Sequence, residues 1–241
     1  MTQPIEVLIG IQARSNSTRF PGKIYEKIGD RRVLDLVIDK AKSAALHVMR
    51  QKNILIRCQV AILHPEGDQK LVNAFSANQC LLIAGPEEDV LARYVTAQRL
   101  TDADYVVRIT SDCPLILDHI ITKHINSAVW QRVDYVENVD EGFRTAADGF
   151  DCEILSRRAI EWLKSNAKDA FDREHVTTLL RKRRPTDLSH GHVQFRYDTS
   201  HLKLSIDTPE DLEFVREYIH KAEYKKMMAL KKCGRGLVFE L

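Results

Sequence analysis

Short apolar runs alternate with helical patterns along the whole chain, and this alternation restricts the fold more than any other feature of the sequence. Residues 5–11 are apolar enough to form a strand buried on both faces, and residues 33–49 then repeat apolar side chains at helical spacing. The same patterns predict further strands at 54–63, 80–84, 105–110, 134–137, 150–155, 193–197 and 202–206, and helices at 69–77, 87–100, 118–130, 156–165, 172–183 and 209–224. The alternation favours an α/β fold of three layers, in which a mostly parallel sheet is covered by helices on both faces.

The composition of the 241 residues is that of an ordinary globular protein with a substantial core, since 44% are hydrophobic and 29% are charged. The formal net charge of +2 argues against a nucleic-acid partner, and no apolar run is long enough to span a membrane. The five cysteines have no C-x-x-C spacing, as expected of reduced thiols in a cytoplasmic protein. No linker or repeat interrupts the chain, so we expect one domain over residues 1–241, with a loosely ordered end from about residue 225.

A loop rich in small, polar and basic residues follows the first predicted strand directly. Residues 13–23 read ARSNSTRFPGK, and they place Arg14, Arg19 and Lys23 beside hydroxyl side chains such as Ser17. Free backbone N–H groups, hydroxyl donors and cations are what a polyphosphate requires. The sequence therefore favours a phosphate-binding loop here, with a solvated basic loop as the alternative.

Two carboxylates follow later predicted strands in a similar way. Asp112 comes just after the strand at 105–110, and Asp207 comes directly after the strand at 202–206. If both strands are parallel to the first, the two aspartates meet residues 13–23 at one edge of the sheet, where ligands bind in such folds. Mg²⁺ takes one or two carboxylates and fills its other positions with water and phosphate oxygens, so this juxtaposition predicts a Mg²⁺ and nucleotide site. Taken singly, Asp112 also suits a turn and Asp207 also suits a helix start.

Six blocks of the sequence, in order over nearly the whole chain, carry a family likeness. They are ARSNSTRFPGK at 13–23, GPEEDVLARY at 85–94, RITSDCPL at 108–115, DGFDCE at 148–153, REHVT at 173–177 and DTPEDL at 207–212. Together they resemble the cytidylyltransferase family of the spore-coat polysaccharide biosynthesis protein F type, which is related to CMP-KDO synthetase and acylneuraminate cytidylyltransferase.

The resemblance implies a Rossmann-like fold of the nucleotide-diphospho-sugar transferase (glycosyltransferase-A-like) type, and an enzyme that is usually a homodimer. It implies a nucleotidyltransferase that transfers CMP from CTP to a sugar acid or a related polyol acceptor, with release of pyrophosphate, in the biosynthesis of a surface polysaccharide. Carried over by position, Arg14 and Lys23 are the catalytic cations, and Asp112 and Asp207 hold Mg²⁺. The implied nucleotide-binding residues are Arg14, Ser17, Arg19, Lys23, Gly85, Arg108 and Asp112.

The acceptor side is expected around the aperiodic segment at 138–149 and the predicted strand that follows it. Alternation along that strand places two acidic residues on one face, and a surface-facing strand edge is the alternative. The candidate substrate-binding residues are Asn138, Arg144, Asp148, Asp151 and Glu153.

Three other segments leave questions open. Residues 62–64 read Ile-Leu-His where relatives carry small hydroxyl residues near the base, so strict selection of cytosine is not established by the sequence. The block at 173–175 suits a subunit contact as well as chemistry. The basic run at 181–185 is interpreted as a solvated helix end, where cations favour the helix dipole.

Two other functions compete with the cytidylyltransferase prediction. A glycosyltransferase of the same fold would use a nucleotide sugar and usually shows an Asp-x-Asp motif, whereas residues 110–112 read Thr-Ser-Asp. A non-catalytic relative acting in a complex would have no reason to keep Arg14, Lys23, Asp112 and Asp207 together, because folding does not require all four.

Overall fold

The structure is a computed structural model, and it describes residues 3–229 and 237–240. Its strands are β1 (Ile5–Gln12), β2 (Lys27–Ile28), β3 (Arg31–Arg32), β4 (Ile56–Pro65), β5 (Leu81–Gly85), β6 (Tyr105–Thr110), β7 (Tyr135–Glu137), β8 (Glu153–Ser156), β9 (His190–Phe195) and β10 (Leu237–Glu240). Its α-helices are α1 (Val33–Met49), α2 (Gln69–Phe75), α3 (Val90–Thr101), α4 (Asp118–Gln131), α5 (Arg157–Asn166), α6 (Ala170–His175), α7 (Thr178–Arg183), α8 (Pro209–Tyr218) and α9 (Ala222–Ala229). Two short 3₁₀ turns are η1 (Lys23–Tyr25) and η2 (Ser76–Asn78).

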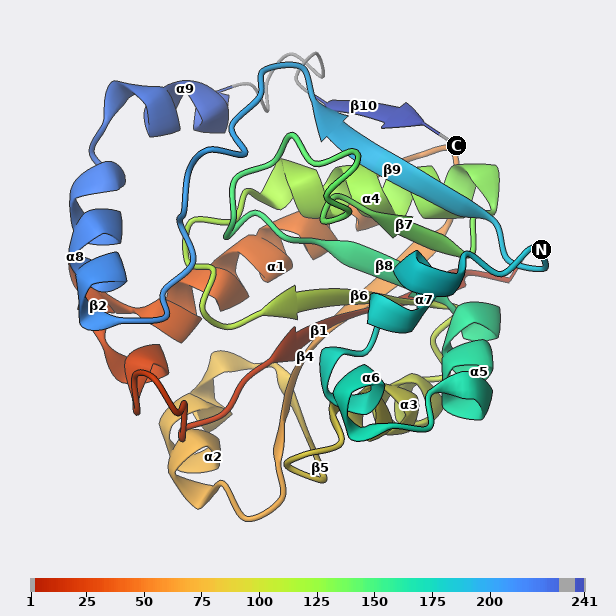
Figure 1. Cartoon of the computed structure of the whole chain (residues 1–241), viewed down its shortest axis with the longest axis horizontal. Helices are drawn as coiled ribbons and strands as arrows, with labels where there is room; N and C mark the ends of the chain where they lie inside the picture. The colour runs from red at the N-terminus through yellow and green to blue at the C-terminus, as the bar shows by residue number, and fades with distance from the viewer. Residues whose placement is uncertain (1–2, 230–236, 241) are drawn as a thin grey trace.

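Within these residues, eight strands form one sheet in the order β10-β9-β7-β8-β6-β1-β4-β5 (Figure 1). Strands β1, β4, β5, β6, β7 and β9 run in one direction, whereas β8 and β10 run against them. Parallel neighbours need long crossover connections, which the helices supply. The mostly parallel α/β sheet predicted from the sequence is therefore confirmed.

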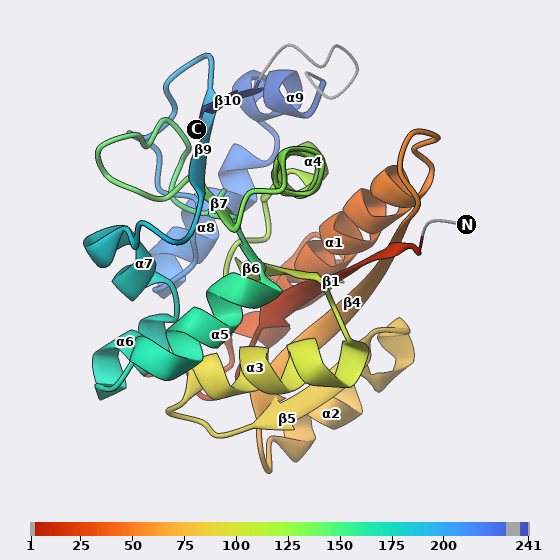
Figure 2. The same ribbon diagram turned by 90° about the vertical axis from the view of Figure 1, so that its right-hand side faces the viewer.

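The central strand β1 explains why helices lie on both sides of the sheet. Val7, Ile9 and Ile11 pack into one apolar layer with α1 and α4, and Leu8 packs into a second layer with α3 and α5. Figure 2 shows α1 and α4 on one side of the sheet and α3 and α5 on the other. Burying a large aliphatic side chain contributes about 1.5–3 kcal/mol. Strand β1 therefore anchors both layers, and its carboxyl end is a rigid base for the loop that follows it.

The predicted strand at 202–206 is wrong. This segment makes one isolated bridge, with Asp148, instead of joining the sheet. Its last backbone N–H, that of Ile206, donates to the carbonyl of Asp112 at 2.9 Å. The segment thus pairs with the loop that contains Asp148 and with the residues just after β6. Asp207 still lies at the predicted edge of the sheet.

Two predicted helices are each divided in two. The helix expected at 172–183 is interrupted at Val176, whose φ of 56° is incompatible with a continuous helix and whose side chain is buried in the core. The helix expected at 209–224 is divided into α8 and α9. Sequence periodicity continues across both breaks, so it could not reveal them.

The expectation of a loosely ordered end from about residue 225 stays a prediction, because residues 230–236 and 241 lie outside the described part of the chain. Helix α9 continues to Ala229, and β10 pairs antiparallel with β9 at the edge of the sheet. Four cysteines, Cys58, Cys80, Cys113 and Cys152, are free thiols, whereas Cys233 lies outside the described residues.

Gly149 allows the loop at 138–149 to close against the segment at 202–206. Its φ is +103°, and a Cβ there would lie 2.6 Å from the backbone carbon of Leu204. We expect Gly149→Ala to lower the free energy of unfolding by about 2–4 kcal/mol, because an unfavourable φ and a backbone clash act together. Gly29→Ala is the matched control for denaturant unfolding, since Gly29 has a φ of +60° but a Cβ there would meet no atom within 4 Å. Equal losses in both variants would contradict the close approach.

Candidate active site

A cleft of about 210 Å³ lies beyond the carboxyl ends of β1 and β6. It brings together six of the residues predicted from the sequence, namely Arg14, Ser17, Arg19, Lys23, Asp112 and Asp207. The other lining residues are Gln12, Ala13, Thr18, Val90, Arg93, Thr110, Ser111 and Glu174. The basic loop and the two carboxylates therefore share one edge of the sheet, as ligand sites in such folds require.

The loop at 13–23 is held in place by the protein itself. Its chain reverses at Gly22, which has a φ of 77° and donates its N–H to the carbonyl of Ser15 at 2.9 Å. Asp68 then fixes Ser15 by accepting from its N–H at 2.8 Å and from its hydroxyl at 2.6 Å. The same carboxylate caps α2 by accepting from the N–H of Leu71. The loop is thus preorganised, and Asp68 is a positioning residue that sequence reasoning missed.

Lys23 lines the cleft and is buried. Its buried ammonium donates to Asp112 Oδ2 at 2.8 Å and to the carbonyl of Ile206 at 2.6 Å, and it lies 3.4 Å from Asp207 Oδ1. Arg19, which is largely exposed, reaches Asp207 Oδ1 at 2.9 Å. One buried cation therefore joins the first loop to both carboxylates.

The charge of Asp112 depends on this contact. Burial alone would raise the pKa of its carboxyl, but the Lys23 ammonium and hydrogen bonds from Lys23 and Thr110 outweigh burial and hold that pKa below its usual value. Asp112 is consequently an anion at neutral pH, ready to pair with a cation.

Asp207 owes its position to the start of α8. Thr208 caps this helix, and Asp211 accepts hydrogen bonds from the N–H groups of both Asp207 and Thr208 in a capping box. The segment thus begins a helix, as one interpretation expected, and it also presents the carboxylate of Asp207 to the cleft.

The donor set of this site fits a divalent cation. Two carboxylates and the Ile206 carbonyl already converge on one positive charge, the Lys23 ammonium. All three offer hard oxygen atoms, the ligands that Mg²⁺ and Mn²⁺ prefer. Asp112 and Asp207 are therefore the residues that would hold such an ion.

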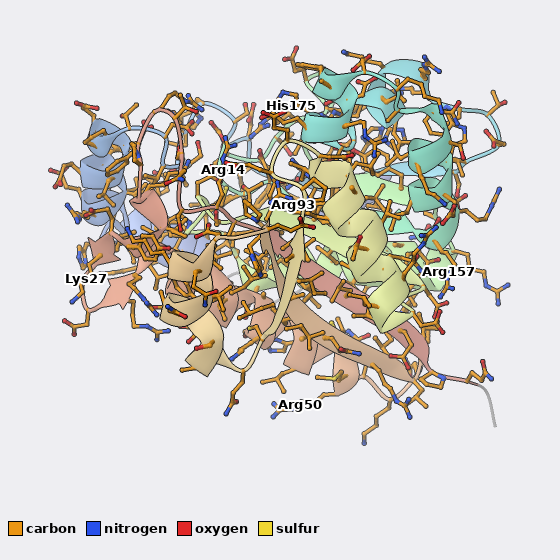
Figure 3. All side chains as sticks on the ribbon, turned by 90° about the horizontal axis from the view of Figure 1, so that it is seen from below. Arg14, Lys27, Arg50, Arg93, Arg157 and His175 are labelled. Atoms are coloured by element: carbon orange, nitrogen blue, oxygen red, sulfur yellow. The ribbon has the colours of Figure 1, made fainter. Side chains whose placement is uncertain are left out.

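Two further arginines line the cleft. The guanidinium of Arg14 makes no hydrogen bond or ion pair with any residue between 3 and 229 or 237 and 240, which leaves it available to an anion. Arg93 is almost fully buried and donates to the carbonyls of Leu63 and Glu87, and its Nε has no hydrogen-bond partner in the part of the chain that the structure describes. Figure 3 shows Arg14 and Arg93 in the same region of the molecule, away from Arg50 and Arg157.

Gly85 acts on the cleft through Arg93. It does not line the cleft, and a Cβ at Gly85 would lie 2.7 Å from Arg93 Cγ. The glycine therefore lets α3 approach the end of β5. Its predicted role in binding nucleotide stays a prediction. Sequence reasoning missed Arg93, although it belongs to the block at 85–94, because an arginine inside a helical pattern gives no sign that it is buried.

The unexplained block at 173–175 connects to the same helix. Arg173 binds Asp89 through two nitrogens, at 2.7 and 2.6 Å, and Asp89 also caps α3 by accepting from the N–H of Ala92. The neighbouring Glu174 lines the cleft. Within this chain, the block fastens α6 to α3 beside the site.

Arg108 and Glu153 lie in a cluster of charged groups outside the lining of the cleft. The predicted contacts of Arg108 with nucleotide and of Glu153 with the acceptor stay predictions. The two residues are register partners on β6 and β8, and Arg108 Nη1 lies 2.6 Å from Glu153 Oε2. Tyr135 and Arg181 donate to the other oxygen of Glu153. Burial would raise the pKa of Glu153, but Arg108 and Arg181 lower it. Arg181 therefore belongs to this cluster instead of a solvated helix end.

The remaining candidates for the acceptor side divide into two groups. Asn138 is buried and ties its loop to the chain before β8, donating to the carbonyl of Phe150 and accepting from the N–H of Cys152. Arg144 pairs with Asp151 at 2.7 Å, and burial raises the pKa of Asp151 to about 6 although Arg144 opposes the shift. Asp148 lies close enough to raise the pKa of Asp151 further. Arg144, Asp148 and Asp151 therefore remain the candidates for contact with a substrate.

Comparison with known proteins identifies relatives. The sequence matches the family described as cytidylyltransferase over residues 8–233. It is 26% identical over 222 residues to the spore coat polysaccharide biosynthesis protein SpsF of Bacillus subtilis, covering 90% of this chain and 88% of that protein. It is 29% identical over 171 residues to the uncharacterized protein MJ1063 of Methanocaldococcus jannaschii, covering 70% of this chain but only 65% of that protein's length.

Solved structures with the same fold include three of interest. A cytidylyltransferase from Leptospira borgpetersenii serovar Hardjo-bovis superposes with a TM-score of 0.80 at 29% identity, covering 95% of this chain and 94% of that one. CMP:2-keto-3-deoxy-manno-octonic acid synthetase complexed with CTP has a TM-score of 0.64 at 14% identity, covering 89% and 98%. Rv0371c of Mycobacterium tuberculosis complexed with manganese has a TM-score of 0.54 at 16% identity, covering 90% and 99%. The last two show the fold alone.

The family match and the similar cytidylyltransferase structure at 29% identity define the class of the protein as a nucleotidyltransferase. Since the family match extends over residues 8–233, the chain belongs to the cytidylyltransferase family, as the six sequence blocks predicted. Among the described helices, none has both the length and the apolar character that a bilayer span requires.

The Lys23–Asp112 ion pair is expected to stabilise the folded protein in a pH-dependent way. Because the pKa of Asp112 is lowered in the folded protein from 3.8, the pair stabilises the fold above that pH and loses its contribution as the pH falls through the folded-state value. We expect Lys23→Met to lower the free energy of unfolding by about 1–3 kcal/mol at neutral pH, since Asp112 loses its charged partner. The difference from the wild type should narrow as the pH falls.

Denaturant unfolding at a series of pH values measures this effect, with Lys27→Met as the control because Lys27 is exposed. A stability difference that stays constant across the acidic range would contradict the role of Lys23 in setting the charge of Asp112.

Proposed function

We propose that this protein is a CTP-dependent cytidylyltransferase that transfers CMP to a sugar acid or a related polyol acceptor with release of pyrophosphate. The observation that carries the proposal is the preorganised loop at 13–23 facing two carboxylates across one cleft. Membership of the cytidylyltransferase family supports the choice of CTP as the donor. The likeness to a polysaccharide biosynthesis protein supports a surface glycan as the destination of the product.

The proposed reaction is a direct transfer of CMP, in which negative charge develops on the phosphate oxygens. An acceptor oxygen attacks the α-phosphorus of CTP, a new P–O bond forms, and the bond to the β-phosphate oxygen breaks to release pyrophosphate. The acceptor's proton passes to water. Negative charge grows on the departing pyrophosphate, and Arg14 and Lys23 are the fixed cations placed to stabilise it.

No nucleophile on the protein is needed, because positioning and electrostatic stabilisation are sufficient for direct transfer. A divalent cation, which we propose to be Mg²⁺, would be held by Asp112 and Asp207 and would supply neutralisation of phosphate charge. The manganese complex of a protein with the same fold supports a divalent ion of this kind.

A second hollow, next to the cleft, could hold the cytosine base of CTP. This hollow, of about 360 Å³, shares Arg14 with the cleft and is otherwise lined by residues 15–16, 65–70 and Glu87. We place the cytosine here, next to the loop that would hold the triphosphate. His64, from the segment that departs from the relatives, is buried within β4, and its Nδ1 donates locally to the carbonyl of Pro65. It therefore does not block the hollow.

The acceptor would meet the α-phosphate from the side of Arg144, Asp148 and Asp151. Asp148 and Asp151 both act electrostatically on Cys113, the neighbour of Asp112, so they lie near the carboxylates of the cleft. Charged and hydrogen-bonding groups of this kind suit a hydroxyl-rich acid. We further propose that the enzyme works as a homodimer in the cytoplasm, where CTP is made.

Thermal unfolding with each nucleoside triphosphate tests the donor. A ligand at a hundredfold its Kd adds about 2.7 kcal/mol of stability, which for a chain of this size is a shift of about 5–11 °C. We expect CTP with Mg²⁺ to give such a shift, ATP, GTP and UTP to give much less, and Asp112→Asn to weaken the effect. Asp187→Asn is the control, because Asp187 is exposed on the connection between α7 and β9.

Other outcomes would each overturn the proposal in a different way. A shift with a nucleotide sugar but with no triphosphate would favour a glycosyltransferase of this fold. No shift with any nucleotide, in a protein that unfolds cooperatively, would favour a non-catalytic relative.

A further inference from the structure

A cluster of three metal-binding side chains lies on β7 and β9, among residues that the proposed reaction does not use. The two strands are parallel neighbours, with Tyr135 opposite His190 and Glu137 opposite His192. Successive side chains of a strand alternate between faces, so His190 and His192 lie on the same face of β9. That face is shared with Glu137 on the adjoining strand.

The three potential ligand atoms converge. One carboxylate oxygen of Glu137, one ring nitrogen of His190 and one of His192 all lie within 4.8 Å of one another. Glu137 Oε1 accepts a hydrogen bond from His192 Nδ1 and lies 3.5 Å from His190 Nε2. That His190 nitrogen is buried and makes no hydrogen bond within the described residues. Ligand atoms at about 2.0–2.1 Å from a tetrahedral ion lie about 3.3 Å apart, so the Glu137–His190 separation already suits an ion, and the Glu137–His192 hydrogen bond would have to open.

Hydrogen bonds to Oε2 of Glu137 fix the orientation of its other carboxylate oxygen, Oε1. Glu137 Oε2 accepts from the backbone N–H groups of Val139 and Asp140, which leaves Oε1 to face the histidines. A metal-binding carboxylate is usually held in this way by hydrogen bonds to its other oxygen.

The environment of Glu137 demands a cation. Its side chain is completely buried, its Oε1 faces the two histidines, and its Oε2 accepts from backbone N–H groups. A buried carboxylate in its charged form needs a positive partner close by. A protonated imidazole can provide that charge, and so can a metal ion bound to neutral histidines.

A hollow beside the cluster provides room for a further ligand. It has a volume of about 190 Å³, and both His190 and His192 belong to its lining together with Tyr135, Phe143 and Arg184. The ring of Phe143 stacks on His192 with centroids 4.0 Å apart and covers one side of the imidazole. The site is thus partly enclosed and keeps one open direction.

We propose that Glu137, His190 and His192 bind one divalent transition-metal ion of the Zn²⁺ type, with water from the hollow as the fourth ligand. Two imidazoles and one carboxylate are the donors that Zn²⁺ takes in proteins, whereas Mg²⁺ prefers oxygen atoms alone. None of the three residues lines the cleft described above. The ion would join β7 to β9 at the point where the loop at 138–149 begins, and so hold the base of the loop that carries the acceptor candidates.

Zn²⁺ alone, titrated into chelator-treated full-length protein, tests the proposal by calorimetry and metal counting. We expect one Zn²⁺ per chain, retained in Asp112→Asn, which weakens the carboxylate site of the cleft. The double variant His190→Gln/His192→Gln should lose at least about tenfold in affinity. His220→Gln is the matched control, because His220 is exposed just beyond α8, and it should bind Zn²⁺ as the wild type does.

X-ray absorption at the zinc edge of the wild-type protein provides a test that needs no variant. Two imidazole ligands are expected. No bound Zn²⁺, equal binding in the double variant, or a zinc spectrum without imidazole ligands would each overturn the proposal and leave the cluster as a hydrogen-bonded triad.

Discussion

The arrangement of the candidate site depends on one buried ammonium group. Lys23 contacts Asp112 and Asp207, which are 89 and 184 residues away in the sequence, and it also contacts the carbonyl of Ile206. Three distant segments are brought together by this single charge: the loop after β1, the end of β6 and the chain before α8. A buried charge is costly unless it is paired, so each segment stabilises the position of the others. The same convergence of oxygen atoms makes the site suitable for a divalent cation.

The two cation sites that we propose differ in their chemistry. The cleft offers carboxylate and carbonyl oxygens at the carboxyl edge of the sheet, next to free and buried arginines, which suits a hard ion and a polyphosphate. The cluster on β7 and β9 offers imidazole nitrogens under an aromatic cover, which suits a borderline metal ion. The loop at 138–149 leaves β7 directly after Glu137. A metal at the second site would therefore support the segment that we assign to the acceptor.

Much of the fold could be predicted from periodicity, because the buried strands and amphipathic helices have strong local signals. The bounds predicted for the first helix, 33–49, and for the strand at 105–110 agree with α1 and β6. Periodicity could not show that residues 202–206 stay outside the sheet. Leu204 and Ile206 are buried, but the backbone of this segment pairs with a loop and with the carbonyl of Asp112, which no local pattern reveals.

Site residues that directly follow a strand could be predicted from the sequence. Residues whose role depends on contacts with distant side chains could not. The loop cations and Asp112 could be placed at one edge of the sheet because parallel strands end together. Asp207 lies at that edge although the strand predicted before it is absent. Glu153 could not be recognised as the buried partner of Arg108 and Arg181, since alternation alone does not tell which face of a strand meets a cluster of charges. Arg93 was hidden for a similar reason, because its burial depends on how closely α3 approaches Gly85.

The central claim is that the loop at 13–23 and the two carboxylates form one nucleotide and metal site. The most direct measurement is a crystal structure with CTP and Mn²⁺, with data collected to locate manganese by its anomalous scattering. We predict a manganese peak in contact with both Asp112 and Asp207, and a triphosphate that contacts Arg14 and Lys23. A triphosphate bound away from this loop, or a manganese ion that touches neither aspartate in the presence of bound CTP, would contradict the account.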